Sequence, residues 1–228
     1  MWDRATLLQA AVWLRSVRGE QVAGRLDEIR QLVGESDDPN RLIPLAKADA
    51  FAAFGAGRLD EARSTWRRVA HLAVFNIPDS MSRAARASLW LGDVVSAADD
   101  LTILDGSGVH GPAIEADRQT IRAGLAALES RAADALHLYR AALGDSRNLG
   151  LIWDEALCGL DMAMLLDSSE PEERDAARAA REIFVRLEAA PFIVRLDAAV
   201  ASTSRNPTPS GAFPDSAHVA TVSRPAPG

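Results

Sequence analysis

The chain has 228 residues, of which 48% are hydrophobic and 25% are charged, and its formal net charge is −7. This length and composition indicate one folded domain or one elongated repeat array. The negative charge excludes a general nucleic-acid-binding surface, because an acidic protein is repelled by a phosphate backbone.

The N-terminus and the cysteine content bear on location. Residues 1–6 lack the basic segment and apolar core of a secretory signal. No run approaches the roughly 18–20 apolar residues that a membrane-spanning helix needs. Cys158 is the single cysteine, so no disulfide forms within the chain. These features predict a cytoplasmic protein with no membrane partner.

Apolar residues recur at helical spacing along most of the chain, with glycine or proline at the interruptions. Two helices are predicted over residues 2–18 and 22–33, and two more over 42–54 and 58–74. The clearest stripe steps by three and four residues through Leu59, Ala62, Trp66, Val69 and Ala73. Gly57 before this stripe predicts a tight turn, because glycine adopts the left-handed conformation at little cost.

The same unit of two helices is predicted three more times. The ranges are 84–91 and 94–104, 114–128 and 135–143, and 151–166 and 176–187. A small residue at the expected helix contact recurs at intervals of 38, 35, 38 and 45 residues, in Gly24, Ala62, Ala97, Ala135 and Ala180. A large residue stands four positions later in all but the first unit: Trp66, Leu101, Tyr139 and Phe184.

Periods of this size with two helices per unit predict an α-solenoid. The predicted fold is therefore all-α, with about five helix hairpins over residues 1–201 and a final capping helix over 192–201. Residues 202–228 are rich in proline, serine and threonine and lack a helical period, so a disordered tail is predicted there.

The hairpin resembles the tetratricopeptide repeat (TPR). Its small and aromatic positions are matched by Ala50, Gly57, Ala62 and Trp66, by Ala85, Gly92, Ala97 and Leu101, and by Ala123, Ala126, Ala135, Tyr139 and Ala142. The resemblance implies a right-handed superhelix. It also implies that these residues hold repeats together: Gly57, Ala62, Trp66, Ala97, Ala135, Tyr139, Ala180 and Phe184.

The end of the array has a resemblance of its own. Residues 172–197 look like the C-terminal helical repeats of large bacterial signalling ATPases, which include nucleotide-cyclase-linked proteins and LuxR-type regulators. In that group the repeats bind or sense partners while other domains carry the chemistry. The resemblance implies a role in bacterial signalling or transcription regulation.

In TPR arrays the first helix of each hairpin lines a concave groove that binds partners. Carrying over the groove positions gives these candidates: Lys47, Phe51, Phe54, Ser82, Arg86, Leu89, Trp90, Asp117 and Thr120. Aromatic and arginine side chains together are typical of binding hot spots. The alternative is that Phe51, Phe54 and Trp90 pack helix against helix.

Catalytic, metal and cofactor motifs are not evident. The glycines of residues 106–111 match G-x-G-x-x-G, but the strand that a dinucleotide site needs does not precede them. The four histidines lie far apart, without the close ligand pairs of a zinc site. Cys158 lies in an apolar run and is predicted to be a small buried hydrophobe. We therefore expect no cofactor and no metal.

The leading hypothesis is a non-enzymatic scaffold that binds a protein or peptide in its groove. The second is a regulatory domain that binds a small effector between helices, detached from a larger regulator; a closed pocket lined by Phe51, Phe54, Arg86 and Trp90 would favour it. The third is an enzyme whose titratable groups meet only in the fold. The oligomeric state is left open.

Overall fold

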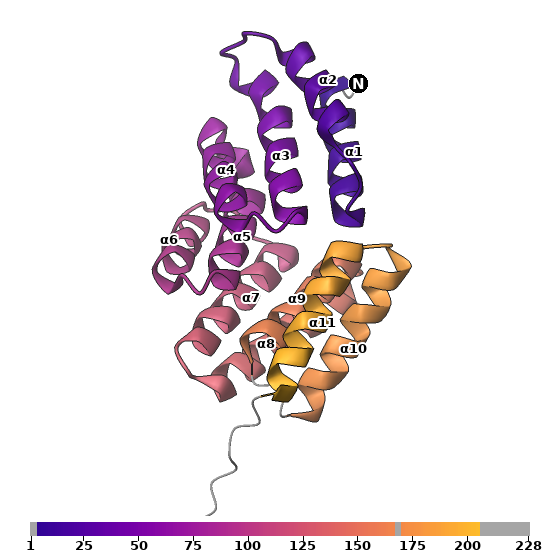
Figure 1. The fold of residues 1–228 in the computed structure, drawn as a ribbon. Coiled ribbons are helices and arrows are strands. Elements are labelled where there is room, and N and C mark those ends of the chain that lie inside the picture. Colours follow the sequence, from indigo (N-terminus) through magenta and orange to yellow (C-terminus); the bar gives the residue numbers. More distant parts are fainter. Residues whose placement is uncertain (1–3, 167–169, 206–228) are drawn as a thin grey trace, which may run out of the picture.

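The computed structural model describes residues 4–166 and 170–205, and all of the regular secondary structure in these ranges is helical (Figure 1). The all-α prediction is confirmed for this part of the chain. Most of the predicted tail, from residue 206 onward, lies outside the described residues.

The helices lie close to the predicted ranges. In chain order they are α1 (Arg4–Arg18), α2 (Ala23–Val33), α3 (Pro39–Gly55), α4 (Leu59–Leu72), the 3-10 helix η1 (Val74–Asn76), α5 (Ile77–Trp90), α6 (Val94–Asp105), α7 (Pro112–Leu128), α8 (Ala132–Leu149), α9 (Ile152–Leu165), α10 (Pro171–Arg186) and α11 (Ala190–Arg205).

Each predicted hairpin is a packed pair of neighbouring helices. The packed pairs are α1 with α2, α3 with α4, α5 with α6, α7 with α8, and α9 with α10. Successive pairs also touch, through α1 with α3, α4 with α5, α5 with α7, and α7 with α9. The chain is therefore a helical bundle in which sequence neighbours are also spatial neighbours.

The turns that follow α1, α3, α5 and α7 share one hydrogen-bond pattern. At the end of α3, the Gly57 amide donates to Phe54 O at 3.1 Å and the Arg58 amide donates to Ala53 O at 2.9 Å. Gly57 takes a φ of +77°, which glycine adopts without the steric penalty of a Cβ. Ser130 makes the equivalent turn between α7 and α8 with a φ of +61°, although no glycine marks it.

The small and large residues singled out in the sequence lie in the core. Ala62, Ala97 and Ala135 have no exposed surface, and Ala180 is 1% exposed. The large partners Trp66, Tyr139 and Phe184 are at most 1% exposed. Gly24 is the exception: it is exposed, and a Cβ placed on it would have no neighbour within 4 Å. The contact predicted for the first unit at Gly24 is therefore wrong.

Helix α11 does more than cover the last pair. It packs against α9 and α10 as predicted, and it also contacts α1 at the other end of the chain (Figure 1). At that contact a Cβ built on Gly19 would lie 3.0 Å from Pro191 Cγ, which leaves no room for a larger residue. The helix continues beyond the predicted end at Ala201 to Arg205.

Among the helices of residues 4–166 and 170–205, none combines the length and the apolar character needed to cross a bilayer.

The close approach of α9 and α10 yields a stability prediction. A Cβ on Gly159 would lie 2.7 Å from Ala176 O and 2.8 Å from Ala180 Cβ, so Gly159→Ala forces the helices apart. We expect the free energy of unfolding, measured by urea titration with circular dichroism, to fall by about 1–3 kcal/mol.

Gly144 is the matched control, because it lies in α8 with no atom within 4 Å of its built Cβ. Gly144→Ala should be neutral or should stabilise by up to about 1 kcal/mol, since alanine is the better helix former. Equal effects of the two substitutions would contradict the close approach.

Candidate functional site

The structure places the predicted groove residues on three first helices, and most of them are buried. Lys47, Phe51 and Phe54 lie on α3, Ser82 to Trp90 on α5, and Asp117 and Thr120 on α7. The residues that are 9% exposed or less are Phe51, Phe54, Ser82, Arg86, Leu89, Trp90 and Thr120. Only Lys47 and Asp117 retain a partly exposed side chain.

The aromatic members of this set contact one another. The ring of Phe54 stacks on Trp90 at 5.0 Å between centroids, and it also lies 5.8 Å from Phe192 of α11. Phe51 lies edge-on to Trp66 at 4.8 Å and contacts Trp13 of α1 at 5.9 Å. The structure therefore shows that Phe51, Phe54 and Trp90 pack helix against helix. Their rings join α1, α3, α4, α5 and α11.

A buried ion pair stands beside the rings. Arg86 Nε donates to Asp161 Oδ2 at 3.0 Å, and Trp90 Nε1 donates to Asp161 Oδ1 at 2.6 Å. The side chain of Asp161 is fully buried and that of Arg86 is 7% exposed. Burial opposes the charge on Arg86, but the nearby carboxylates of Asp161, Asp117 and Asp154 outweigh it and raise its pKa. Arg86 is therefore a fixed cation that ties α5 to α9.

Asp161 was not among the predicted site residues. The sequence held one signal for it, since it is a lone acid in the apolar run of residues 156–166. A charge inside such a helix needs a buried partner. The sequence did not show which residue would supply it, because Arg86 lies 75 positions away.

The side of α3, α5 and α7 that carries the predicted groove residues is called the inner face here. Asp117 of α7 has an unusual environment on this inner face. Burial and the nearby Asp154 carboxylate raise its pKa, Arg86 and the Ser82 hydroxyl lower it, and the net result is a pKa of about 6. Because its ordinary value is 3.8, the folded protein holds this proton more tightly than the unfolded chain does.

Lys47 is also engaged on this face. Its Nζ lies 3.3 Å from Asp79 Oδ2, and Arg83 Nε donates to Asp79 Oδ1 at 2.7 Å. The guanidinium of Arg83 in turn lies 5.1 Å from the centre of the Phe51 ring. The polar rim of the inner face is thus a connected set of charged pairs above aromatic rings.

The space among the inner-face rings is small. The cavity lined by Trp13, Phe51, Phe54, Trp153 and Phe192 measures about 10 Å³, which is room for one water molecule at most. A closed pocket lined by Phe51, Phe54, Arg86 and Trp90 would have favoured effector binding, but the cavity beside Phe51 and Phe54 is too small for an effector.

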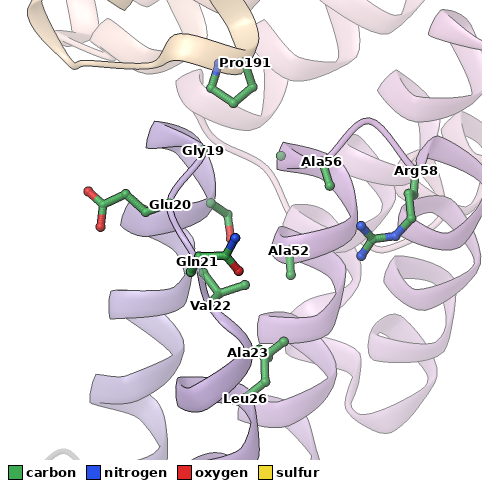
Figure 2. A pocket seen from close by; sticks show the side chains of 12 residues that line it. Gly19, Glu20, Gln21, Val22, Ala23, Leu26, Ala52, Ala56, Arg58 and Pro191 are labelled. Atoms are coloured by element: carbon green, nitrogen blue, oxygen red, sulfur yellow. The ribbon is translucent and has the colours of Figure 1, made fainter.

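A much larger hollow lies elsewhere, where the α1–α2 turn, the end of α3 and the start of α11 meet (Figure 2). Its volume is about 620 Å³. Among its lining residues are Ser16, Gln21, Ala52, Arg58 and Pro191. Sequence reasoning missed this pocket, because its walls come from segments far apart in the chain and none of them carries a motif.

Cys158 and the possible metal-ligand side chains are the remaining candidate chemical groups. Cys158 is 1% exposed, and burial raises the pKa of its thiol well above the ordinary value, so it is a packed side chain as predicted. Within the described ranges, no three His, Cys, Asp or Glu side chains come together as metal ligands would.

Comparison with known proteins yields no relative: no family model matches the chain, nor does any curated protein or solved structure. The resemblance to TPR arrays and to the repeats of signalling ATPases stays a prediction.

The Arg86–Asp161 pair leads to a mutational prediction. Arg86→Met leaves Asp161 buried without its cationic partner, so the free energy of unfolding at pH 7 should fall by about 3–5 kcal/mol. Urea titration measures this change. The double variant Arg86→Met with Asp161→Leu should recover part of the loss, because it removes the stranded charge. The control Arg122→Met breaks an exposed pair with Asp105 and should cost at most about 1 kcal/mol.

Asp117 leads to a pH prediction. Because its folded-state pKa is raised to about 6, its contribution to stability is lost as the pH rises from about 4 to about 6. Asp117→Asn removes that loss, so the variant should exceed the wild type by about 1–2 kcal/mol at pH 7.5 and match it near pH 4. Denaturant titrations at several pH values test this. The exposed Asp99→Asn is the control, and a difference that does not vary with pH would contradict the assignment.

Proposed function

We propose that the chain is a non-enzymatic helical-repeat scaffold that binds a protein or peptide partner, in bacterial signalling or transcription regulation. The observation that carries the proposal is the turn between α4 and α5. Val74 and Phe75 are each 71% exposed there, next to Asn76, which is 2% exposed. Two adjacent large apolar side chains that are exposed to solvent indicate a surface that a partner covers.

Other connections between the hairpins also have exposed apolar side chains in them or beside them. In a stack of hairpins, the loops that join one pair to the next fall along one edge. Val109 lies in the connection between α6 and α7, while Leu149 and Ile152 are the last residue of α8 and the first residue of α9; these side chains are 37%, 42% and 45% exposed. We propose that these side chains, with Val74 and Phe75, form one apolar edge that a peptide or protein covers.

The inner face contributes less to this proposal than the sequence suggested. Its aromatic side chains are already covered by neighbouring helices, including α11, so a partner reaching that face meets the charged rim of Lys47, Asp79 and Arg83. The apolar part of the partner surface is therefore assigned to the edge rather than to the concave groove.

The proposal is tested at Phe75. The double variant Val74→Ser with Phe75→Ser should leave the circular dichroism spectrum and the melting temperature unchanged, because both side chains are exposed. Capture of partners from an extract of the organism that encodes the chain should fall at least about thirtyfold for the specific partner, as expected for a hot spot of about 2 kcal/mol.

Val95→Ser is the matched control, since Val95 is 72% exposed on α6, away from these loops. It should leave capture unchanged. Undiminished capture by the double variant would show that the partner does not use this edge.

A second function, binding of a small regulatory effector between helices, is favoured by the hollow of about 620 Å³ beside α11. Its size is in the usual range for small-molecule sites, about 300–1,000 Å³. This function would suit a sensing module derived from a larger ATPase or cyclase regulator.

A further inference from the structure

The pocket beside α11 is built at the meeting point of two helix ends and two helix starts. The end of α1 and the end of α3 reach it through Ser16 and Gly55, while α2 begins at its wall with Val22 and Ala23. Pro191, in the first turn of α11, lines it from another side (Figure 2). The polar groups at this junction decide what it binds.

The hydrogen-bond acceptors at the two helix ends are already used. At the end of α1, the amides of Gly19 and Glu20 donate to Ser16 O and Arg15 O at 3.2 and 2.9 Å. At the end of α3, the amides of Ala56, Gly57 and Arg58 donate to carbonyls of that helix. These carbonyls therefore each have an intramolecular donor already.

Donors at the same junction are free. Ser16 is only 6% exposed and lines the pocket, yet its Oγ has no hydrogen-bond partner in the described structure. A buried hydroxyl without a partner costs about 1–3 kcal/mol, so a ligand that bonds to it regains that energy. No side chain caps the start of α2, whose first amides face solvent or a ligand.

Arg58 supplies a charge. Its Nε donates to Glu61 Oε2 at 2.6 Å, and its two Nη groups make no hydrogen bond within the described residues. Figure 2 shows the Arg58 side chain reaching toward the hollow from the start of α4, while Glu20 turns to the opposite side. Glu20 is paired with Arg15 at 3.1 Å, so its negative charge is compensated.

A second guanidinium lies close behind Arg58. Arg195 of α11 has a buried Nη1 without a hydrogen-bond partner, and its Nη2 lies 3.1 Å from the position that a Cβ on Gly57 would take. It stacks over Trp90 at 4.8 Å rather than pairing with a carboxylate. Arg58 keeps Glu61 as its ion-pair partner, whereas Arg195 has no carboxylate partner among the described residues, so the positive charge beside the junction is only partly balanced.

The remaining wall is apolar, with Val22, Ala23, Leu26 and Ala52. We infer that this pocket binds a small organic carboxylate, with the carboxylate at Ser16 and Arg58 and a short apolar body against Ala52 and Leu26. The inference rests on the second function proposed above, effector binding, and names the chemical class of the effector.

The test uses the full chain and three probes: hexanoate, hexan-1-ol and inorganic phosphate. Hexanoate should bind in calorimetry and should shift the backbone amide resonances of Gly19, Gln21 and Ala52. Arg58→Gln should weaken hexanoate at least about tenfold, as expected for a charge-assisted hydrogen bond. The control Arg122→Gln lies on α7, away from the pocket, and should leave the affinity unchanged.

Ser16→Ala separates a binding role from a structural one. Removing an unpartnered buried hydroxyl should leave the melting temperature of the free protein unchanged or higher, while hexanoate binding weakens about threefold to tenfold. A variant that lowers the melting temperature and binds hexanoate normally would overturn the role of Ser16 in the site.

The probes also separate this inference from the wider function. The carboxylate assignment is overturned if hexanol binds as tightly as hexanoate or if phosphate binds more tightly than hexanoate. In either case effector binding in this pocket stands. If no probe moves the Gly19, Gln21 and Ala52 resonances, and a fragment set of neutral and cationic compounds of the same size also fails, both the inference and the effector function are wrong.

Discussion

The arrangement of the helices depends on one carboxylate, Asp161, in the middle of the fold. It accepts hydrogen bonds from Arg86 and Trp90 of α5 and has no exposed surface. The contacts inside each hairpin are local and would form in many arrangements of the pairs. The ion pair of Arg86 and Asp161 joins α5 to α9, and its two residues are 75 positions apart in the sequence. Burying either charge without the other is unfavourable. An arrangement that separated Asp161 from Arg86 would leave two charges buried without partners, which is unfavourable.

The hairpins themselves were readable from the sequence because their information is local. The stripe through Ala62 and Trp66 repeats in steps of three and four residues, and the turn at Gly57 follows from a backbone conformation that glycine favours. The Ser130 turn adopts the same conformation without glycine, so a residue type alone did not mark it. Gly24 shows the opposite error, because a small residue in register is no proof of a helix contact.

Only part of the inner face could be predicted from the sequence, and the reason is physical. The sequence placed Phe51, Phe54, Arg86 and Trp90 on first helices, and the structure brings Phe54 and Trp90 of this set into contact. It did not show what covers them, because the covering groups, Asp161 and Phe192, come from the far end of the chain. The pocket at Ser16 was beyond reach for a related reason: it is defined by donors that lack partners, and a missing partner leaves no pattern in a sequence.

Helix α11 connects these two regions. Pro191 lines the pocket, while the next residue, Phe192, is fully buried among the rings of Phe54, Trp153 and Phe184. A ligand that displaces or tightens the start of α11 must therefore also shift Phe192, because adjacent residues of one helix move together. Close packing makes such a shift costly in the aromatic core. Occupancy of the pocket would thus be felt among the aromatic rings around Phe192 through α11.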